Sequence, residues 1–399
     1  MKIAIFSDNL YPEMSGISDS VIVLAKNLSK LGQDVVFFAP KYSAKDFKVI
    51  GAEAREIDLG DKVKVVRFGA LPYSMPTGQG RLVLPTFWRW LKTKKEKIDI
   101  IHTQDFFGVG LEALMAAKIL KIPLVGTNHT MITEFLKYGP LQNKFAEDLS
   151  RRFVSWYYNK CELVTAPSKC ILKEMKQFGL KKLSQVVSNP IELKEYSPVS
   201  EDAITKLKKD FNFSDHTVLC SGRLADEKHV DIVIRAIDVV KKVIPNINLA
   251  ITGGGIAEKS LRQLVRELNL VDNVKFLGFV EQNALIKVYQ AADIYAIAST
   301  AETQSLSLMK AMAAGLPVIG VNAWALPEYI NDSNGFVVKP GDYQAMAEKI
   351  ISLSQNGSLR QKLKQGGLAA VKNFSEENIA EQWIGIYSSI INKNNRLTI

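Results

Sequence analysis

Residues 294–321 have the sequence IYAIASTAETQSLSLMKAMAAGLPVIGV, and this stretch indicates the fold class of the chain. A short apolar run at 294–297 predicts a strand, and a polar loop follows it. A helix then begins near Ser305, and a second apolar run at 317–321 predicts another strand. A strand, a helix and a strand in this order place two parallel strands in one sheet.

The same alternation continues on both sides of this stretch. Further strands are expected at residues 2–6, 34–39, 98–102, 123–127, 217–221, 247–253 and 274–277. Helices are expected at residues 17–31, 110–120, 230–243 and 256–268. This pattern predicts parallel sheets with helices on both faces. The expected fold class is therefore α/β, with two doubly wound, Rossmann-like domains whose strand ends face a shared cleft.

Length and composition agree with two domains. The chain has 399 residues, of which 47% are hydrophobic and 23% charged, and these values exclude a disordered or low-complexity protein. Residues 188–200 lack periodicity and contain Pro190 and Pro198. We therefore predict an N-terminal domain at 1–190, a linker at 191–200, and a C-terminal domain that begins at 201.

The basic excess of the chain lies entirely in its N-terminal half. Residues 1–190 contain 28 Lys and Arg against 18 Asp and Glu, whereas the remaining residues contain 23 of each kind. This asymmetry favours an anionic partner for the N-terminal half. Three cysteines do not make a disulfide framework and fit a reducing compartment. The first residues become polar too early for a signal peptide, and no apolar stretch is uninterrupted, so a cytoplasmic location is expected.

Three strand-to-helix loops contain residues suited to a phosphate-bearing ligand. Gly16 opens a helix, whose free N–H groups favour an anion, although a plain turn explains it as well. Arg223 and Lys228 can converge on a diphosphate, but a solvated loop with two cations is common. Residues 253–255 are three glycines that fit close backbone approach to a ligand or a flexible turn, and they do not form a dinucleotide fingerprint.

The loop before Ser305 offers a carboxylate next to backbone donors. Glu302 lies just ahead of the helix, where its carboxylate is suited to accept hydrogen bonds from sugar hydroxyls. The helix N-terminus offers N–H groups to a phosphate. The simpler explanation is that Glu302 and Ser305 only cap the helix.

Together and in this order, these motifs resemble the nucleotide-sugar glycosyltransferases of glycosyltransferase family 4, which retain anomeric configuration and have the GT-B fold. The specific matches in the C-terminal half are Gly222-Arg223-Leu224, Glu227-Lys228, Gly253-Gly254-Gly255, Glu302-Thr303-Gln304 and Ala311-Met312-Ala313-Ala314-Gly315-Leu316-Pro317-Val318. The matches in the N-terminal half are Ser15-Gly16, His102 and Thr127-Asn128-His129-Thr130. Asn373-Phe374-Ser375 and Trp383 resemble the start of the family's C-terminal helix, which implies that residues 376–399 cross back to the N-terminal domain. Glu302-Thr303-Gln304 and Ser15-Gly16 especially resemble the branch that glucosylates diacylglycerol.

The resemblance implies roles for these residues. Arg223 and Lys228 would hold the donor diphosphate, Glu302 would hold the donor sugar, and His129 would lie beside the reaction centre. These four are the predicted catalytic residues. The predicted donor-binding residues are Gly16, Gly254, Gln304, Ser305, Leu306 and Lys310. UDP-glucose is the favoured donor, and no metal is expected because the chain has no Asp-x-Asp and its His and Cys residues lack zinc spacing.

Two positions depart from the family pattern. The family places a second glutamate eight residues after the first, and this chain has Lys310 there. Lysine only donates hydrogen bonds, so this residue fits a ribose hydroxyl, an extra phosphate, an unusual donor or a degenerate site. Trp324 stands in a loop where the family often has a glycine pair, which leaves the donor identity open.

Three basic and aromatic stretches of the N-terminal half suit a membrane surface with anionic headgroups. The first, in which Phe87, Trp90 and Leu91 share a face, has the predicted membrane or acceptor residues Trp88, Arg89, Trp90, Lys92, Lys94 and Lys95. The second has Lys144, Arg151, Arg152 and Lys160 around Trp156, Tyr157 and Tyr158, and the third has Lys169, Lys173, Lys176, Lys181 and Lys182. The alternative for each stretch is a solvated helix face with its aromatic residues in the core. No nucleic-acid motif matches.

The leading hypothesis is a retaining glycosyltransferase, peripheral on the cytoplasmic face of the membrane. It would move a hexose, with glucose favoured, from a nucleotide sugar to a lipid acceptor such as diacylglycerol. One alternative is transfer of mannose or another sugar to a soluble, phosphorylated or phosphoinositide-type acceptor. The other is a non-catalytic binding protein that has kept the GT-B fold.

Overall fold

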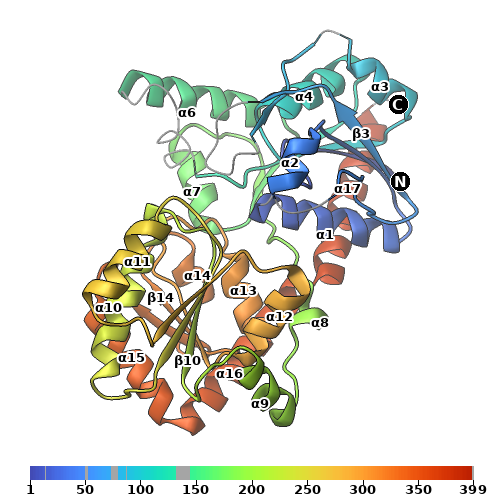
Figure 1. The fold of residues 1–399 in the computed structure, drawn as a ribbon. Helices are drawn as coiled ribbons and strands as arrows, with labels where there is room; N and C mark the ends of the chain where they lie inside the picture. The colour runs from blue at the N-terminus through green and yellow to red at the C-terminus, as the bar shows by residue number, and fades with distance from the viewer. Residues whose placement is uncertain (14, 50–52, 73–79, 87, 132–143, 398–399) are drawn as a thin grey trace. The chain divides into compact units, whose positions relative to one another are not determined.

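The computed structural model describes the chain except residues 14, 50–52, 73–79, 87, 132–143, 398 and 399 (Figure 1). The chain forms two compact units. Unit 1 comprises Met1–Pro190 and Glu376–Ile399, and unit 2 comprises Ile191–Ser375. The C-terminal segment therefore belongs to the same unit as the N-terminus.

Unit 1 is built on a parallel sheet with the strand order β3-β2-β1-β6-β7-β8-β9. Most of its strands are buried apolar runs without alternation, as a sheet covered on both faces requires. The strands are β1 (Lys2–Phe6), β2 (Asp34–Pro40), β3 (Val63–Phe68), β6 (Ile100–Thr103), β7 (Leu124–Thr127), β8 (Leu163–Ala166) and β9 (Ser184–Val186). A short antiparallel pair, β4 (Leu71–Pro72) and β5 (Arg81–Leu82), stands apart from this sheet.

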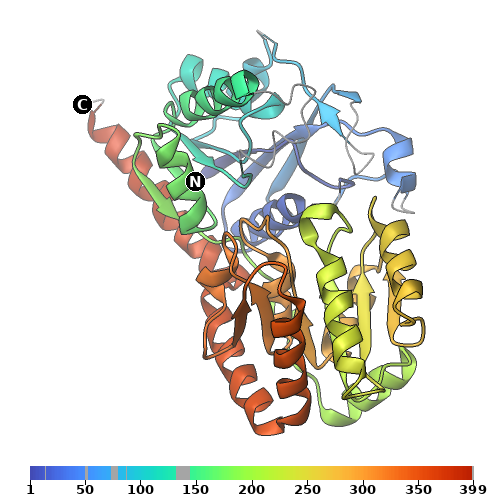
Figure 2. The same cartoon turned by 90° about the vertical axis from the view of Figure 1, so that its left-hand side faces the viewer.

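The helices of unit 1 bury their apolar faces against the sheet and against one another. Ser15 caps the first of them, because its Oγ accepts a hydrogen bond from the Ser18 backbone N–H at 3.1 Å. The last, drawn in red and ending at the C-terminus in Figure 2, buries Trp383 and Tyr387 in the same core as the first. The helices are α1 (Gly16–Lys30), α2 (Ala44–Val49), α3 (Trp90–Lys95), α4 (Gly108–Leu120), α6 (Lys144–Tyr158), α7 (Lys169–Gln177) and α17 (Glu376–Leu397).

Unit 2 contains a second parallel sheet, with the strand order β12-β11-β10-β13-β14-β15. Its central strands β10, β11 and β13 are buried almost throughout, because helices cover both faces. The strands are β10 (Thr217–Ser221), β11 (Asn248–Thr252), β12 (Val274–Gly278), β13 (Ile294–Ala296), β14 (Val318–Val321) and β15 (Gly335–Val338).

The helices of unit 2 form two layers (Figure 1). Helices α10, α11 and α15 lie on one side of the sheet, and α12, α13 and α16 lie on the other. The helices are α8 (Leu193–Tyr196), α9 (Glu201–Asp210), α10 (Val230–Lys241), α11 (Glu258–Glu267), α12 (Gln282–Ala291), α13 (Leu306–Ala313), α14 (Leu326–Tyr329), α15 (Tyr343–Gln355) and α16 (Gly357–Val371). Two single 3₁₀ turns, η1 (Asp226–Lys228) and η2 (Lys372–Phe374), complete the unit.

The predicted α/β class and the two parallel sheets are confirmed. The strands expected at 2–6 and 217–221 match β1 and β10, and the strand expected at 98–102 begins two residues later as β6. The predicted linker at 191–200 differs more. Ile191 and Tyr196 are buried in unit 2, and the Ile191 backbone N–H donates to the Phe374 carbonyl at 2.9 Å. The segment packs as part of unit 2, because its apolar side chains complete that core.

Candidate functional site

Three loops of unit 2 lie together at one edge of its sheet. They follow strands β10, β11 and β13, and β10 is hydrogen-bonded to both of the others. Because the carboxyl ends of parallel strands meet at the same edge, the three loops are neighbours. The structure therefore brings together the loops that carry Arg223 and Lys228, Gly254, and Glu302 with Gln304.

Lys228 and Glu302 form an ion pair across two of these loops. The Lys228 Nζ donates to the Glu302 Oε1 at 2.6 Å, and the two side chains are 22% and 10% exposed. Arg223 is more open, and its Nη2 donates to the Glu227 Oε1 at 2.8 Å. Glu227 belongs to the Glu227-Lys228 match, but the sequence analysis gave it no role, although its i, i+4 spacing from Arg223 was a usable signal for this pair. The site thus contains two cationic side chains, and each is paired with a carboxylate.

Further hydrogen bonds join these loops to each other and to the loop after β14. The Thr300 backbone N–H donates to the Glu227 carbonyl at 3.0 Å, and the His229 Nε2 lies 3.0 Å from the Thr300 Oγ1. The Ala325 backbone N–H donates to the Glu302 carbonyl at 3.2 Å. These contacts surround Lys228 and Glu302, so the distance between the two charges is set by the fold.

The start of α13 separates the two explanations offered for Glu302 and Ser305. Ser305 is the N-cap, and its Oγ accepts from the Leu308 backbone N–H at 3.4 Å. Glu302 instead binds Lys228, so it is not a helix cap. Gln304 and Ser305 are buried, whereas Leu306 is half-buried at the first helical position, where backbone N–H groups have no acceptor within the helix.

The glycines after β11 do not all serve the same purpose. A Cβ on Gly253 would lie 2.1 Å from the Gly222 carbonyl oxygen, and one on Gly255 would lie 2.2 Å from the Leu224 carbonyl oxygen. These two glycines therefore let neighbouring loops pack backbone against backbone. Gly254 is exposed, and the nearest atom to its Cβ would be the Glu258 Oε2 at 3.9 Å. Only Gly254 keeps the open backbone that a ligand requires.

Lys310 has a packing contact that the sequence did not indicate. Its ammonium lies 5.6 Å from the ring centroid of Tyr196, in helix α8. Cations are attracted to the face of an aromatic ring, so this contact stabilises α8 on α13. Trp324, the other departure from the family pattern, is half-buried with φ 46°, in the left-handed region.

The predicted residues of unit 1 lie on two different elements. Gly16 is exposed at the first position of α1. His129 follows β7 and is 8% exposed, and its Nε2 lies 2.7 Å from the Gln104 Oε1. Burial lowers the pKa of His129 to about 4, so the imidazole is neutral at pH 7. No group in the described part of the chain forms a hydrogen bond with its Nδ1.

Three carboxyl groups, of buried Glu13 and half-buried Asp8 and Asp105, were missed by the sequence prediction. The Asp105 Oδ2 accepts from the Ser7 Oγ at 3.1 Å and from the Asp8 backbone N–H at 2.9 Å. Burial raises the pKa of Asp105 to about 6 and that of Glu13 to about 7, and burial with the Asp105 charge raises the pKa of Asp8. Asp8 and Asp105 each stand two residues after a strand, β1 and β6, and this position was the available signal.

The first basic and aromatic stretch presents most of its predicted residues to solvent. Trp88 is 65% exposed, and Trp90 is half-buried at the start of α3. Lys92, Lys94 and Lys95 are exposed. Arg89 differs from the prediction, because it turns inward. Its Nη1 donates to the Leu84 carbonyl at 2.7 Å and lies 3.2 Å from the Glu112 Oε1, so it neutralises a buried carboxylate. Phe87 lies outside the described residues.

Helix α6 divides the second stretch between surface and core. Phe145, Leu149 and Trp156 are exposed, and with exposed Arg152 they follow i, i+4, i+7, i+11 spacing along one face. We call these four residues the α6 face. Arg151 lies off this face, 3.5 Å from both Glu147 and Asp148. Tyr157 and Tyr158 are fully buried in unit 1, as the alternative explanation of this stretch expected.

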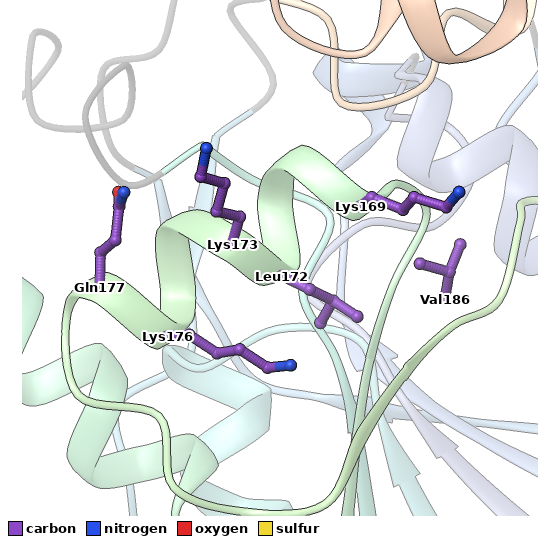
Figure 3. A pocket seen from close by; sticks show the side chains of 6 residues that line it. All are labelled: Lys169, Leu172, Lys173, Lys176, Gln177 and Val186. Atoms are coloured by element: carbon purple, nitrogen blue, oxygen red, sulfur yellow. The ribbon is translucent and has the colours of Figure 1, made fainter.

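Helix α7 carries an open basic pocket (Figure 3). Lys169, Lys173 and Lys176 project from the helix around Leu172, and Val186 of β9 lies opposite. Gln177 completes the lining. Lys181 and Lys182 are also exposed, beyond the end of the helix.

None of the helices in the described part of the chain is long and apolar enough to span a bilayer. Among the same residues, no three His, Cys, Asp or Glu side chains are grouped so that they would hold a metal ion.

Two family models match the chain, one in each half. The family described as "Glycosyltransferase Family 4" matches residues 14–195, and "Glycosyl transferases group 1" matches residues 203–369. An alpha-monoglucosyldiacylglycerol synthase of Acholeplasma laidlawii is 26% identical over 407 residues, covering 99% of each chain. A protein of the same name from Streptococcus pneumoniae is 26% identical over 337 residues, covering 83% of this chain and 74% of its own. The crystal structure of Anabaena HepE with UDP and glucose has a TM-score of 0.78 and 22% identity, covering 98% of this chain and all of that one.

Proposed function

The chain belongs to glycosyltransferase family 4 and has the GT-B fold, and we propose that it transfers glucose from UDP-glucose to a diacylglycerol-type lipid with retention of configuration. One observation carries the proposal. The Lys228–Glu302 ion pair joins the loops that follow β10 and β13, and Arg223 stands in the same loop as Lys228. This arrangement provides cations for a diphosphate and a carboxylate for a sugar at one sheet edge.

The two cations suit the departure of a nucleoside diphosphate. Arg223 offers a planar fork and Lys228 a point charge, so together they stabilise the negative charge that grows on the leaving phosphate. When the diphosphate binds Lys228, the Glu302 carboxylate is released to accept hydrogen bonds from donor hydroxyls. Because the cations provide the positive charge, we expect turnover without a divalent metal.

The same arrangement explains retention without a carboxylate nucleophile. The acceptor oxygen attacks the anomeric carbon from the face that the phosphate leaves, forming the new C–O bond as the C–O bond to phosphate breaks. The departing phosphate oxygen takes the hydroxyl proton of the acceptor. Neutral His129 is suited to hydrogen-bond a neutral sugar or acceptor hydroxyl beside this centre. The proposed donor is supported by HepE, which was crystallised with UDP and glucose.

The proposed acceptor is supported by the surface of unit 1 and by the names of its relatives. The α6 face combines exposed Phe145, Leu149 and Trp156 with Arg152, which is the composition of a helix that lies in a membrane interface. The basic pocket of α7 and the lysines of α3 add positive charge, which the anionic lipids of the cytoplasmic leaflet attract. We therefore propose a peripheral protein on that leaflet. Both synthases from A. laidlawii and S. pneumoniae are named for a glucosyl diacylglycerol product.

A transfer assay tests the proposal. The full chain is incubated with UDP-glucose and vesicles that contain diacylglycerol and an anionic lipid, with and without EDTA. We expect glucosyl lipid in both conditions, and none from the Glu302→Gln variant. GDP-mannose and soluble sugar phosphates replace the donor and acceptor in parallel reactions. Transfer only in those reactions, or only with added metal, would contradict the proposal.

A further inference from the structure

The amide side chain of Gln104 connects His129 to the interior of unit 1. Gln104 follows β6, is 2% exposed, and directs its Oε1 to the Nε2 of His129 at 2.7 Å. Its Nε2 lies 3.1 Å from the ring nitrogens of His102. The amide therefore stands between two buried imidazoles, with its acceptor toward one and its donor toward the other.

His102 is itself held from two sides. Its Nδ1 lies 2.7 Å from the hydroxyl of Tyr387 in α17, and its Nε2 lies 2.7 Å from the Oγ1 of Thr127. Trp383 packs on the ring with a centroid separation of 4.2 Å. The amide is placed with its nitrogen beside this ring and its oxygen beside His129.

The direction of this amide decides where His129 carries its proton. A carbonyl oxygen only accepts hydrogen bonds, so the His129 Nε2 must be the protonated nitrogen. A neutral imidazole has one proton, and its Nδ1 then carries a lone pair. That Nδ1 is buried and has no hydrogen-bond partner among the described residues. A buried acceptor without a donor is costly, and this marks a place where a ligand donates.

We propose that Gln104 is a positioning residue that holds His129 in the tautomer protonated at Nε2, so that its Nδ1 lone pair is presented to a substrate hydroxyl. The role of His129 beside the substrate rests on the proposed function, whereas the tautomer does not. The hydroxyl belongs to the donor sugar or to the acceptor lipid, and both have the same hydrogen-bonding chemistry.

The tautomer is measured by ¹⁵N NMR of the full chain with ¹⁵N-labelled histidine. The chain has only 4 histidines, so the ring signals can be resolved and assigned with a His129→Asn variant. We expect a protonated Nε2 and an unprotonated Nδ1 for His129 at pH 7. A protonated Nδ1 in the unmodified protein would overturn the proposal, whatever the activity.

Two substitutions of Gln104 separate positioning from packing. Gln104→Leu removes the acceptor, so we expect mixed His129 tautomers and a kcat/KM about tenfold lower. Gln104→Glu keeps an acceptor on Nε2 and adds a negative charge. We expect it to keep the tautomer and move the acid limb of the kcat/KM profile upward by about 1–3 pH units, because the carboxylate stabilises the imidazolium. His102 faces the same carboxylate, and its separate NMR signals show which ring takes the proton.

Thr165→Val is the matched control. The Thr165 Oγ1 lies 2.7 Å from the Thr127 Oγ1, so this variant disturbs the same buried network without touching Gln104 or His129. We expect a lower Tm with an unchanged tautomer and pH profile. A rise in donor KM in Gln104→Leu assigns the hydroxyl to the sugar, and a rise in acceptor KM assigns it to the lipid. An unchanged tautomer in Gln104→Leu, or an unchanged pH profile in Gln104→Glu, would refute the positioning role.

Discussion

Removal of Lys228 should reduce stability and turnover for two separable reasons. In Lys228→Ala the Glu302 carboxylate, which is 10% exposed, loses the ammonium at 2.6 Å. Breaking a fully buried ion pair costs about 3–5 kcal/mol, and exposed pairs contribute about 0–1 kcal/mol. Because Lys228 is 22% exposed, we expect a loss of about 2 kcal/mol. For a unit of this size the Tm should fall by roughly 4–8 °C.

The effect on catalysis should be larger than the effect on folding. Removing one preorganised charge from a transition state typically lowers kcat about 10²–10³-fold. The double variant Lys228→Ala with Glu302→Gln removes the unpaired carboxylate, so it should recover most of the lost stability and none of the activity. Stability is measured by urea unfolding followed by circular dichroism, and activity by transfer from UDP-glucose to lipid.

A surface lysine of the same unit provides the control. Lys242 is 71% exposed and lies 3.9 Å from Asp238, so Lys242→Ala should change stability by less than about 0.5 kcal/mol and leave turnover unchanged. If Lys228→Ala kept turnover within about threefold of the unmodified protein, the diphosphate assignment would be wrong. If it kept full stability, the energetic account of the ion pair would be wrong.

Three further predictions concern other parts of the molecule. Gly255→Ala should lower the free energy of unfolding in urea by about 2–3 kcal/mol, because its Cβ would collide with the Leu224 carbonyl oxygen. Gly254→Ala should lower it by less than about 0.5 kcal/mol, and equal losses would contradict this packing. Burial raises the pKa of Glu13 to about 7, so the folded state holds this proton more tightly than the unfolded state does. The free energy of unfolding should therefore decrease as the pH rises from about 4.5 to 7. Glu13→Gln should remove roughly 3 kcal/mol of that pH dependence, and an unchanged slope would refute the assignment. Trp156→Ala should weaken binding to anionic vesicles about tenfold, whereas Tyr157→Phe on the same helix should leave it unchanged. Equal binding of the two variants would refute the proposed membrane contact of the α6 face.

The sequence was most informative where one local rule acts alone. Apolar runs such as 217–221 are long enough for a strand, and the sheet that buries them needs nothing else, so β10 was placed correctly. Ser305 was placed correctly at the start of α13, because the polar side chain and the helical pattern after it agree.

The sequence was less informative where a contact joins distant segments. Arg89 stands in a basic and aromatic stretch that is typical of a membrane-facing surface. Its guanidinium instead pairs with buried Glu112, which is 23 positions away in the sequence. Tyr157 and Trp156 are adjacent aromatic residues, and only the packing of α6 buries one and exposes the other. Gln104 reaches His129 across 25 positions, so no local pattern could assign it a role.

The anomeric configuration of the product distinguishes retaining transfer to lipid from any other reaction of this chain. The full chain is incubated with UDP-glucose, whose anomeric carbon is in the α configuration, and with diacylglycerol in anionic vesicles. The anomeric proton of the glucolipid is then observed by NMR. We expect an α-glucosyl lipid that forms in the presence of EDTA. A β-glucosyl product, or no lipid product at all, would contradict this expectation.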